Sequence, residues 1–353
     1  MGGATVAKNK GAKKRPGADG KNRKRAEKSG AARPRAARDG YIPFAVRFKA
    51  WWEGVDPADL LEPSGKAKDD AGKIVIDGDA PEETGRWPES RRALCSRIWA
   101  KMENDEVVGP GGSDYSVELA KPMSLNEKKS AIDLGAGLGG GTRRLNGVLG
   151  VWVTGYELDE ELAGHANELS RMHGQERRAP VHHLDEENFE LPEKKADGIL
   201  MRERFYRVRN KPKFLDTVFE GLKPRGHLIM TDFVLTDEAA AADPLVEKWL
   251  AIEAQVHEQS EEPPLWTKAD FKKALLEKRL DLRIFEDETD KFAGLIREGW
   301  AQFVEGLEKS EMTRTFVDNM MREAEYWLIL NKVLESGKVR YIRIHGIRGG
   351  ETL

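Results

Sequence analysis

The chain has 353 residues, of which 39% are hydrophobic and 34% are charged, and its one cysteine is Cys95. This composition is too polar for a membrane protein and too apolar for a wholly disordered one, and no run reaches the roughly 18–20 apolar residues of a transmembrane helix. A single cysteine excludes an intrachain disulfide and any zinc site built on several cysteines, so we expect a reducing, cytoplasmic location.

The net charge of −3 conceals a strongly basic N-terminal segment. Residues 1–40 hold 13 lysines and arginines against Asp19, Glu27 and Asp39, which gives 13 − 3 = +10 and leaves −3 − 10 = −13 for the rest of the chain. The segment has too few large apolar side chains to offset the entropy of an ordered chain. We therefore predict a disordered basic tail. Its candidate partners are an anionic membrane surface or nucleic acid, and a plain solubilising tail is the alternative.

Residues 41–120 are predicted to form a helical lid segment. Aromatic side chains recur at near-helical spacing from Phe44 to Trp52, which predicts a helix that packs on the core. Residues 62–86 are rich in Gly, Asp, Lys and Pro and are expected to form an exposed loop. Further helices are predicted at 88–102 and 115–120.

From residue 131 onward, short apolar runs alternate with helical segments. The runs are 131–134, 152–156, 198–201, 227–230, 282–285 and 339–344, and helices are predicted at 140–149, 159–173 and 210–222. This alternation is typical of a parallel sheet with crossover helices. Two amphipathic helices separate the last two runs and form an insertion before the final strand.

A glycine-rich loop, Gly135-Ala-Gly137-Leu-Gly139-Gly-Gly141, follows the first apolar run. Glycines allow a tight turn and a close approach to a ligand, and the following helix N-terminus offers free N–H groups. The loop also fits the dinucleotide pattern G-x-G-x-x-G, so hydride transfer with NAD is one alternative. Asp133 favours S-adenosylmethionine, because a carboxylate there would repel a pyrophosphate but suits an ammonium group.

Two more acids are expected at successive strand ends. Glu157 ends the second run, 24 residues after Asp133, and could accept both ribose hydroxyls of either cofactor. Asp185 follows the third strand, which is expected to contain His182 and His183 and to precede the run at 198–201, and it could accept from an adenine amino group. Carboxyl ends of parallel strands lie at one edge of a sheet, so the three acids together indicate a nucleoside-containing cofactor.

On these motifs, residues 86–348 resemble the class I S-adenosylmethionine-dependent methyltransferases, and within them the branch of phosphoethanolamine and related small-amine N-methyltransferases. The resemblance is carried by Gly109-Pro-Gly-Gly112, Ala131-Ile-Asp-Leu-Gly-Ala-Gly-Leu-Gly-Gly-Gly141, Val153-Thr-Gly-Tyr-Glu-Leu158, Asp197-Gly-Ile-Leu-Met-Arg-Glu203, residues 222–233 and residues 266–271. It implies a doubly wound, mostly parallel seven-stranded Rossmann-like sheet within residues 121–353, with an antiparallel last strand. It also implies methyl transfer from S-adenosylmethionine to a small acceptor, an amine by preference, with a lipid-linked acceptor as a further option.

The resemblance assigns cofactor contacts to positions at strand ends and in the lid. These positions are Asp133, Gly135, Gly137, Glu157, Leu158, Asp185, Glu186, Arg202 and Gly109. Asp133 would meet the cofactor's amino group, Glu157 would hold the ribose, and Asp185 with Glu186 would flank the adenine.

The sequence departs from this branch where a phosphobase would be held. Enzymes of the branch use a tyrosine–histidine pair, and spacing puts Trp87 and Arg207 at those two positions. Neither side chain can take up a proton. A substrate-phosphate arginine of the family falls near Pro264, so phosphoethanolamine is disfavoured as the acceptor. Methyl transfer itself remains feasible, because it depends mainly on alignment and on exclusion of water.

Glu203 and Arg207 are the candidate catalytic residues. Glu203 is the nearest remaining acid to the expected methyl group and could serve as a base or an ammonium partner; a structural ion pair with a neighbouring arginine is the alternative. Arg207 could bind an anionic group of the acceptor. Trp87, Tyr206 and Trp266 are candidates for the walls of the acceptor pocket, with plain core packing as the alternative.

A second function class stays open: a cofactor-binding protein without turnover that acts through protein or nucleic-acid contacts. No metal site is predicted, because the adjacent His182 and His183 would point to opposite faces of a strand. The oligomeric state and the identity of the acceptor are not predicted.

Overall fold

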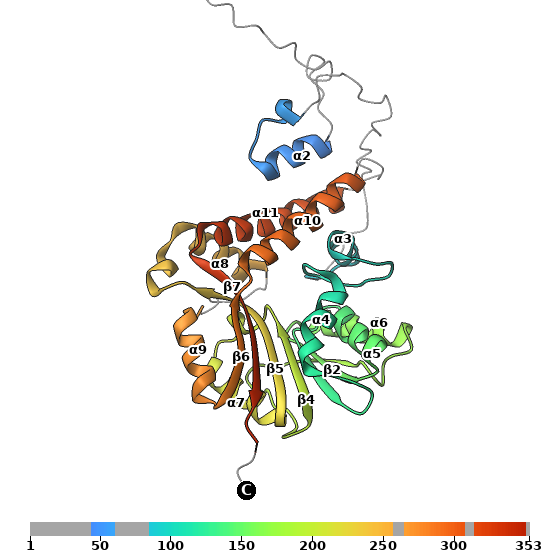
Figure 1. Ribbon diagram of the computed structural model, residues 1–353. Helices are drawn as coiled ribbons and strands as arrows, with labels where there is room; N and C mark the ends of the chain where they lie inside the picture. Colours follow the sequence, from blue (N-terminus) through green and yellow to red (C-terminus); the bar gives the residue numbers. More distant parts are fainter. Residues whose placement is uncertain (1–43, 61–84, 257–264, 308–313, 351–353) are drawn as a thin grey trace, which may run out of the picture.

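The computed structural model describes residues 44–60, 85–256, 265–307 and 314–350. Within these residues, seven strands form one sheet in the order β3-β2-β1-β4-β5-β7-β6, with helices on both of its faces (Figure 1). This arrangement confirms the predicted fold class. The predicted basic tail and nearly all of the predicted loop at 62–86 lie outside the described residues, so the partners suggested for the tail stay predictions.

The strands are β1 (Ser130–Leu134), β2 (Trp152–Glu157), β3 (Val181–His183), β4 (Ala196–Arg202), β5 (Leu222–Leu235), β6 (Leu280–Asp287) and β7 (Val339–Arg348). β1 pairs in parallel with both β2 and β4. β7 runs antiparallel between β5 and β6, as expected for the last strand. The strand order reverses at β1 and β4, and ligands of open α/β sheets bind at such a switch point, outside the carboxyl ends of the strands.

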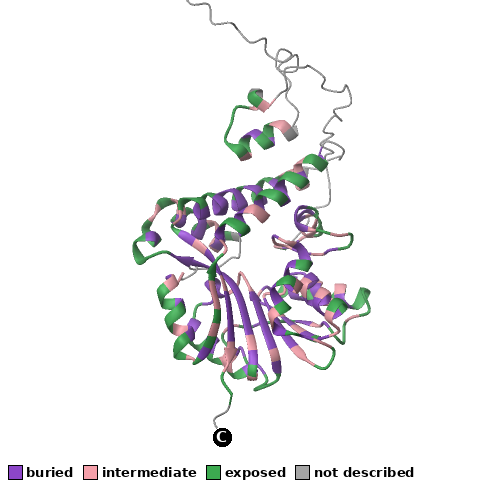
Figure 2. Ribbon diagram, in the orientation of Figure 1, coloured by how far each residue is buried: buried purple, intermediate pink, exposed green. Residues whose placement is uncertain are grey.

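Alternate residues of each central strand enter different hydrophobic layers. Ile199 and Met201 belong to a core that includes α7 (Lys211–Gly221) and α9 (Lys268–Glu277), whereas Leu200 packs with α4 (Gly112–Ala120) and α5 (Gly140–Leu149). Successive side chains of a strand point to opposite faces, so both faces of these strands are buried. Figure 2 shows buried strands beneath helices whose outer faces are exposed.

A helical layer lies across the upper end of the sheet in Figure 1. It consists of α2 (Phe44–Glu53), α3 (Glu89–Trp99), α8 (Pro244–Val256), α10 (Thr289–Leu307) and α11 (Arg314–Ser336). Aromatic rings join these helices: Trp99 of α3 lies 6.4 Å from Trp300 and 4.7 Å from Trp327, measured between ring centroids. Phe48 packs 5.6 Å from Trp300, which confirms that the first helix docks on the core.

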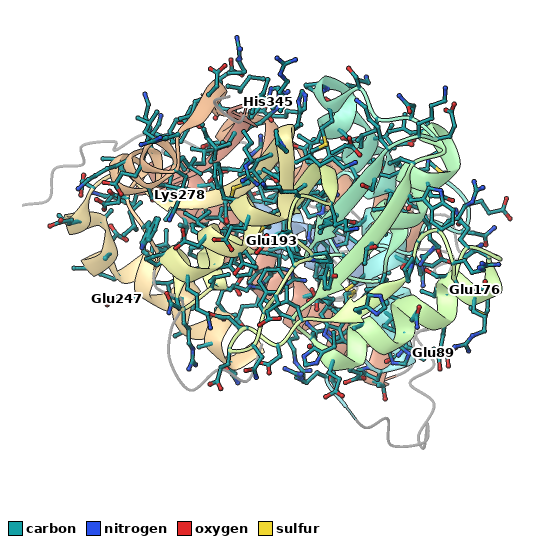
Figure 3. All side chains as sticks on the ribbon, turned by 90° about the horizontal axis from the view of Figure 1, so that it is seen from below. Glu89, Glu176, Glu193, Glu247, Lys278 and His345 are labelled. Carbon is teal, nitrogen blue, oxygen red and sulfur yellow. The ribbon has the colours of Figure 1, made fainter. Side chains whose placement is uncertain are left out.

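The predicted helix boundaries differ from the observed ones in the lid. α3 ends at Trp99 rather than near residue 102, because Ala100 is extended with φ −61° and ψ 135°. α6 (Glu160–Met172) agrees with its prediction, whereas α8 and α9 were not predicted. No described helix combines the length and the apolar character needed to cross a bilayer. Charged side chains such as Glu89, Glu176 and Glu247 lie exposed at the margin of the molecule (Figure 3).

Candidate functional site

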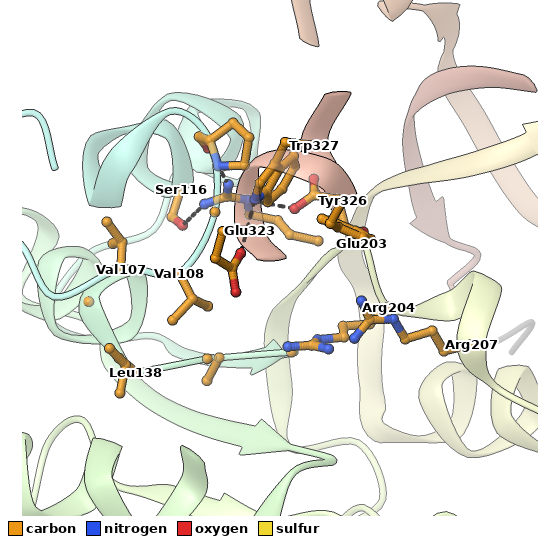
Figure 4. A pocket seen from close by; sticks show the side chains of 18 of the residues that line it. Val107, Val108, Ser116, Leu138, Glu203, Arg204, Arg207, Glu323, Tyr326 and Trp327 are labelled. Carbon is orange, nitrogen blue, oxygen red and sulfur yellow. Dashed lines mark hydrogen bonds and ion pairs between the residues drawn. The ribbon is translucent and has the colours of Figure 1, made fainter. Parts of the chain in front are cut away.

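A pocket lies where β1 and β4 end, between the sheet and the helical layer (Figure 4). The residues that line it form two ends, one beside the sheet and one beside the helical layer. The sheet end includes Val108, Gly109, Ser116, Asp133, Gly135, Gly137, Arg202 and Arg204, and the helical end includes Trp87, Arg91, Tyr206, Arg207, Phe233, Phe292, Arg322, Glu323, Tyr326 and Trp327, with Glu203 between them. The pocket therefore joins the predicted cofactor loop to three of the predicted acceptor residues.

Three glycines of the loop have backbone angles that other residues adopt only with strain. Gly135, Gly137 and Gly139 have φ values of +85°, +56° and +75°, which only glycine adopts without strain. A Cβ on Gly140 would lie 2.4 Å from the carbonyl oxygen of Glu106, so the loop packs directly against the lid segment. α5 begins at Gly140 and directs its free N–H groups toward the loop, as a helix N-terminus does at nucleotide sites.

Asp133 is buried, with 3% of its surface exposed, and lines the pocket. Its Oδ2 accepts a hydrogen bond of 2.7 Å from Thr142 Oγ1. Burial raises the pKa of Asp133, while the Thr142 hydrogen bond and the charge of Arg202 act in the opposite direction. A carboxylate has about four lone-pair positions, so Asp133 retains acceptor capacity for an ammonium group.

Arg202 stands at the end of β4 beside Asp133. Its guanidinium donates to Ser116 Oγ at 3.1 Å and to the Pro110 carbonyl at 2.9 Å. Its Nε is buried and has no hydrogen-bond partner among the described residues, although Glu203 Oε2 lies 3.7 Å away. A buried donor beside a buried acid matches the carboxylate and ammonium groups of an amino acid.

Glu157 is fully buried and does not line the pocket. Its Oε2 accepts from the Gly137 N–H at 2.7 Å and from Arg204 Nη2 at 3.0 Å, and its Oε1 accepts from the Asp159 N–H at 3.1 Å. The Arg204 side chain crosses the glycine loop to reach it. The predicted ribose acid is thus at its expected strand end but is covered, and its neighbour Leu158 is outside the lining as well.

Three further predicted residues lie away from the pocket lining. Asp185 is exposed and accepts hydrogen bonds from its neighbours Asn188 and Glu187. Glu186 accepts from the backbone N–H groups that lead into α7. Trp266 packs against the core, 5.5 Å from the ring of Phe205, because its carbonyl accepts from the Leu235 N–H and so holds the chain before α9 beside the end of β5. The structure therefore does not bring these residues together with Asp133.

Glu203 lines the pocket but is held by structural partners. Thr231 Oγ1 and the Tyr341 hydroxyl both donate to its Oε1. Its backbone has a φ of +47°, in the left-handed region that non-glycine residues rarely adopt. Such strain is held by surrounding structure and is common at functional sites.

Trp87 and Arg91 form one wall of the helical end. The Trp87 indole N–H donates to Asp159 Oδ2 at 3.1 Å, and the Arg91 guanidinium lies 3.9 Å from the centre of the Trp87 ring. Arg91 is itself paired with Glu323 of α11 at 2.8 Å. The sequence analysis missed Arg91 and Glu323. Glu323, Tyr326 and Trp327 share one face of α11 by their spacing, but that pattern is indistinguishable from core packing.

Tyr206 and Arg207 are joined by a buried acid from α8 that the sequence analysis also missed. Arg207 Nε donates to the Tyr206 hydroxyl at 2.7 Å, and this hydroxyl donates to Glu253 Oε1 at 2.7 Å. Arg207 Nη2 lies 2.9 Å from Glu253 Oε2, and Tyr326 also donates to Glu253. Burial raises the pKa of Tyr206, which keeps its hydroxyl protonated. Across the described residues, no three His, Cys, Asp or Glu side chains gather as metal ligands.

Comparison with known proteins agrees with the fold described above. Residues 114–283 match the family model described as a methyltransferase domain. The chain is 26% identical over 144 residues to phosphoethanolamine N-methyltransferase of Plasmodium falciparum, which covers 40% of this chain and 53% of that protein. It is 26% identical over 136 residues to phosphoethanolamine N-methyltransferase 1 of Arabidopsis thaliana, which covers 38% of this chain and 27% of that protein.

A solved structure of phosphoethanolamine N-methyltransferase 2 from Haemonchus contortus superimposes with a TM-score of 0.61 and 15% identity, covering 74% of this chain and 59% of that one. The matched part of the chain thus spans about half the length of the first curated relative and about a quarter of the second. Residues 114–283 thus match a methyltransferase domain, and the solved structure shows that the chain shares its fold.

Proposed function

We propose that this chain transfers a methyl group from S-adenosylmethionine to a small amine. The observation that carries the proposal is one pocket in which the glycine loop, Asp133 and Arg202 meet an aromatic end that also contains carboxylates. The curated relatives are named phosphoethanolamine N-methyltransferases, which supports an amine as the acceptor. The Haemonchus structure was solved with phosphomonomethylethanolamine and S-adenosylhomocysteine.

The residues at the sheet end fit the amino-acid part of the cofactor. Asp133 would hold the ammonium group, Arg202 would hold the carboxylate, and the glycine loop would admit the rest of the ligand close to the backbone. When bound, the cofactor supplies a methyl group that is already activated by a sulfonium. The lid segment at Val108 and Gly109 would exclude water from the site.

The two buried arginines of the helical end argue against a phosphate group on the acceptor, whereas the exposed Arg322 also lines that end. Its two buried arginines already have carboxylate partners, Arg91 with Glu323 and Arg207 with Glu253. A phosphate would have to compete with these buried acids for the guanidinium groups. An amine with an uncharged body meets no such competition and finds aromatic walls. We therefore place small amines without a phosphate first among the acceptors.

Loss of the tyrosine–histidine pair is compatible with this role. Trp87 and Arg207 cannot remove a proton from an ammonium group, but solvent can do so before the amine enters the pocket. Glu203 borders both ends of the pocket and would orient the amine, with Thr231 and Tyr341 fixing its carboxylate. Rate enhancement would then come mainly from alignment of the reactants.

Calorimetry with S-adenosylmethionine and S-adenosylhomocysteine tests the first step. We expect micromolar binding by the wild type and at least tenfold weaker binding by Asp133→Asn, a loss of about 1.4 kcal/mol. The matched control is Asp114→Asn, which removes an exposed acid paired with Arg144 outside the pocket. No binding by the wild type would refute the proposal.

Methyl transfer to panels of amines with and without a phosphate group tests the second step. We expect turnover with some phosphate-free amine and little with phosphoethanolamine. Binding without turnover on either panel would instead favour a cofactor-binding protein that acts through other contacts. The observation that supports this second function, cofactor binding without turnover, is that Trp87 and Arg207 stand where the family has its tyrosine–histidine pair.

A further inference from the structure

The Arg204 side chain occupies the floor of the cofactor end of the pocket. A Cβ on Gly135 would lie only 2.0 Å from Arg204 Cγ and 2.9 Å from its Nε, so the arginine stem runs directly over the first glycine of the loop. Figure 4 shows the side chain extended toward that side of the pocket. A ligand that uses the loop at Gly135 therefore meets Arg204 first.

The same arginine engages the acid expected to hold the ribose. Glu157 is fully buried, and its ion pair with Arg204 is only 13% exposed on the arginine side. Three donors already surround the carboxylate: the N–H groups of Gly137 and Asp159, and Arg204. A carboxylate offers about four lone-pair positions, and a ribose diol needs two of them. Ribose and Arg204 cannot both be satisfied by Glu157.

Hydrogen bonds hold the backbone beside Arg204. The ion pair between Arg204 and Glu157 would therefore break by movement of the Arg204 side chain alone. Glu203 donates its N–H to the Thr231 carbonyl at 2.8 Å, and its carboxylate is held by Thr231 and Tyr341. Its left-handed φ of +47° turns the chain immediately before Arg204. The turn therefore directs a long, flexible side chain over the glycine loop, where its guanidinium is bound by Glu157.

We infer that Arg204 sets the affinity of this chain for its cofactor, by competing with the cofactor's ribose for the carboxylate of Glu157. The inference rests on the proposed function, since it takes a nucleoside ligand as given. Each binding event must first break a buried ion pair, and that cost is subtracted from the affinity the pocket would otherwise have. Removing the arginine removes the cost and leaves Glu157 free to accept from the ribose.

Calorimetric titration of the full chain with S-adenosylmethionine and S-adenosylhomocysteine tests this. We expect Arg204→Ala to bind both ligands at least tenfold more tightly than the wild type. Arg204→Gln keeps much of the stem but loses the charge, so we expect a smaller gain of at least threefold. The matched control is Arg297→Ala, which breaks an exposed pair with Glu335 on the helical layer and should change affinity less than twofold. Circular dichroism confirms that each variant is folded.

A Glu157→Gln background separates competition from a general effect of charge. There the ribose acid is already altered, so adding Arg204→Ala should give less than a threefold gain. Equal or weaker binding by folded Arg204→Ala and Arg204→Gln, with a wild type that does bind, would overturn this inference alone. A gain of the same size in the Glu157→Gln background would also overturn it. No binding by any variant would overturn both the inference and the proposed function.

Discussion

The strongest prediction about stability concerns Glu253, the acid on α8 that joins Tyr206 to Arg207. Glu253 has no exposed surface and accepts hydrogen bonds from two tyrosine hydroxyls, one of them at 2.7 Å from Tyr206. Arg207 is buried as well, with its Nη2 2.9 Å from Glu253 Oε2. Burial alone would lower the pKa of Arg207, but the charge of Glu253 more than compensates, so the pKa of Arg207 is raised and the guanidinium stays charged.

The Glu253→Gln substitution keeps the size of the side chain but removes its charge. Arg207 would then be a buried cation without a counter-charge. Breaking a buried pair in this way costs about 3–5 kcal/mol, which is a large part of the roughly 5–15 kcal/mol that stabilises a typical domain. Replacing both partners, with Glu253→Leu and Arg207→Met, should cost clearly less than the sum of the two single changes, because no charge is left unpaired.

Urea unfolding followed by circular dichroism measures these free energies, and the four proteins of the cycle give the coupling energy of the pair. Glu247→Gln is the matched control, because Glu247 is exposed on the same helix and should change stability by less than about 0.5 kcal/mol. A loss of less than about 1 kcal/mol in the free energy of unfolding for Glu253→Gln would refute the interpretation that Glu253 and Arg207 form a buried ion pair at the helical end of the pocket. Additive effects of the two single changes would refute it as well.

Two further predictions concern regions outside the pocket. His345 is stacked on His227, and burial lowers the pKa of His345 from 6.5 to about 4. The unfolded chain binds the extra proton between these values, so the free energy of unfolding should fall as the pH drops from 6.5 towards 4, and His345→Gln should flatten this dependence in urea titrations. On α10, a Cβ on Gly299 would lie 2.6 Å from the Trp99 ring, whereas one on Gly294 would meet nothing within 4 Å. Gly299→Ala should therefore destabilise by about 1–3 kcal/mol and Gly294→Ala should stabilise by about 0.5–1 kcal/mol; urea midpoints that shift in the same direction would contradict this reasoning.

The sheet was predictable because its strands are buried on both faces and read as short apolar runs. Parallel strands end at one edge, so the strand ends predicted that Asp133, Glu157 and Asp185 would lie near one another, and the family resemblance added Arg202. The two missed helices carried weaker signals. α9 begins after Thr267, whose side chain accepts from the Asp270 N–H, and this cap could have been recognised. α8 begins at Pro244, a favoured first helical residue, but its core face carries the polar Glu253 and hides the amphipathic pattern.

The side-chain partners within the pocket were not predictable in the same way. Asp133 and Glu157 occupy equivalent places at neighbouring strand ends, yet Thr142 leaves acceptor positions free on the first, and Arg204 covers the second. The position of an acid at a strand end fixes where its Cα lies. Whether its carboxylate can accept from a ligand depends on whether a long side chain from another element already reaches it. Arg204 follows Glu157 by 47 residues and reaches it from the turn at Glu203, whose carboxylate accepts from Thr231 of β5 and Tyr341 of β7. Under the proposed function, different side chains would therefore control the acid predicted for the amino-acid end and the acid predicted for the ribose end, and Arg204 lies outside the glycine motif.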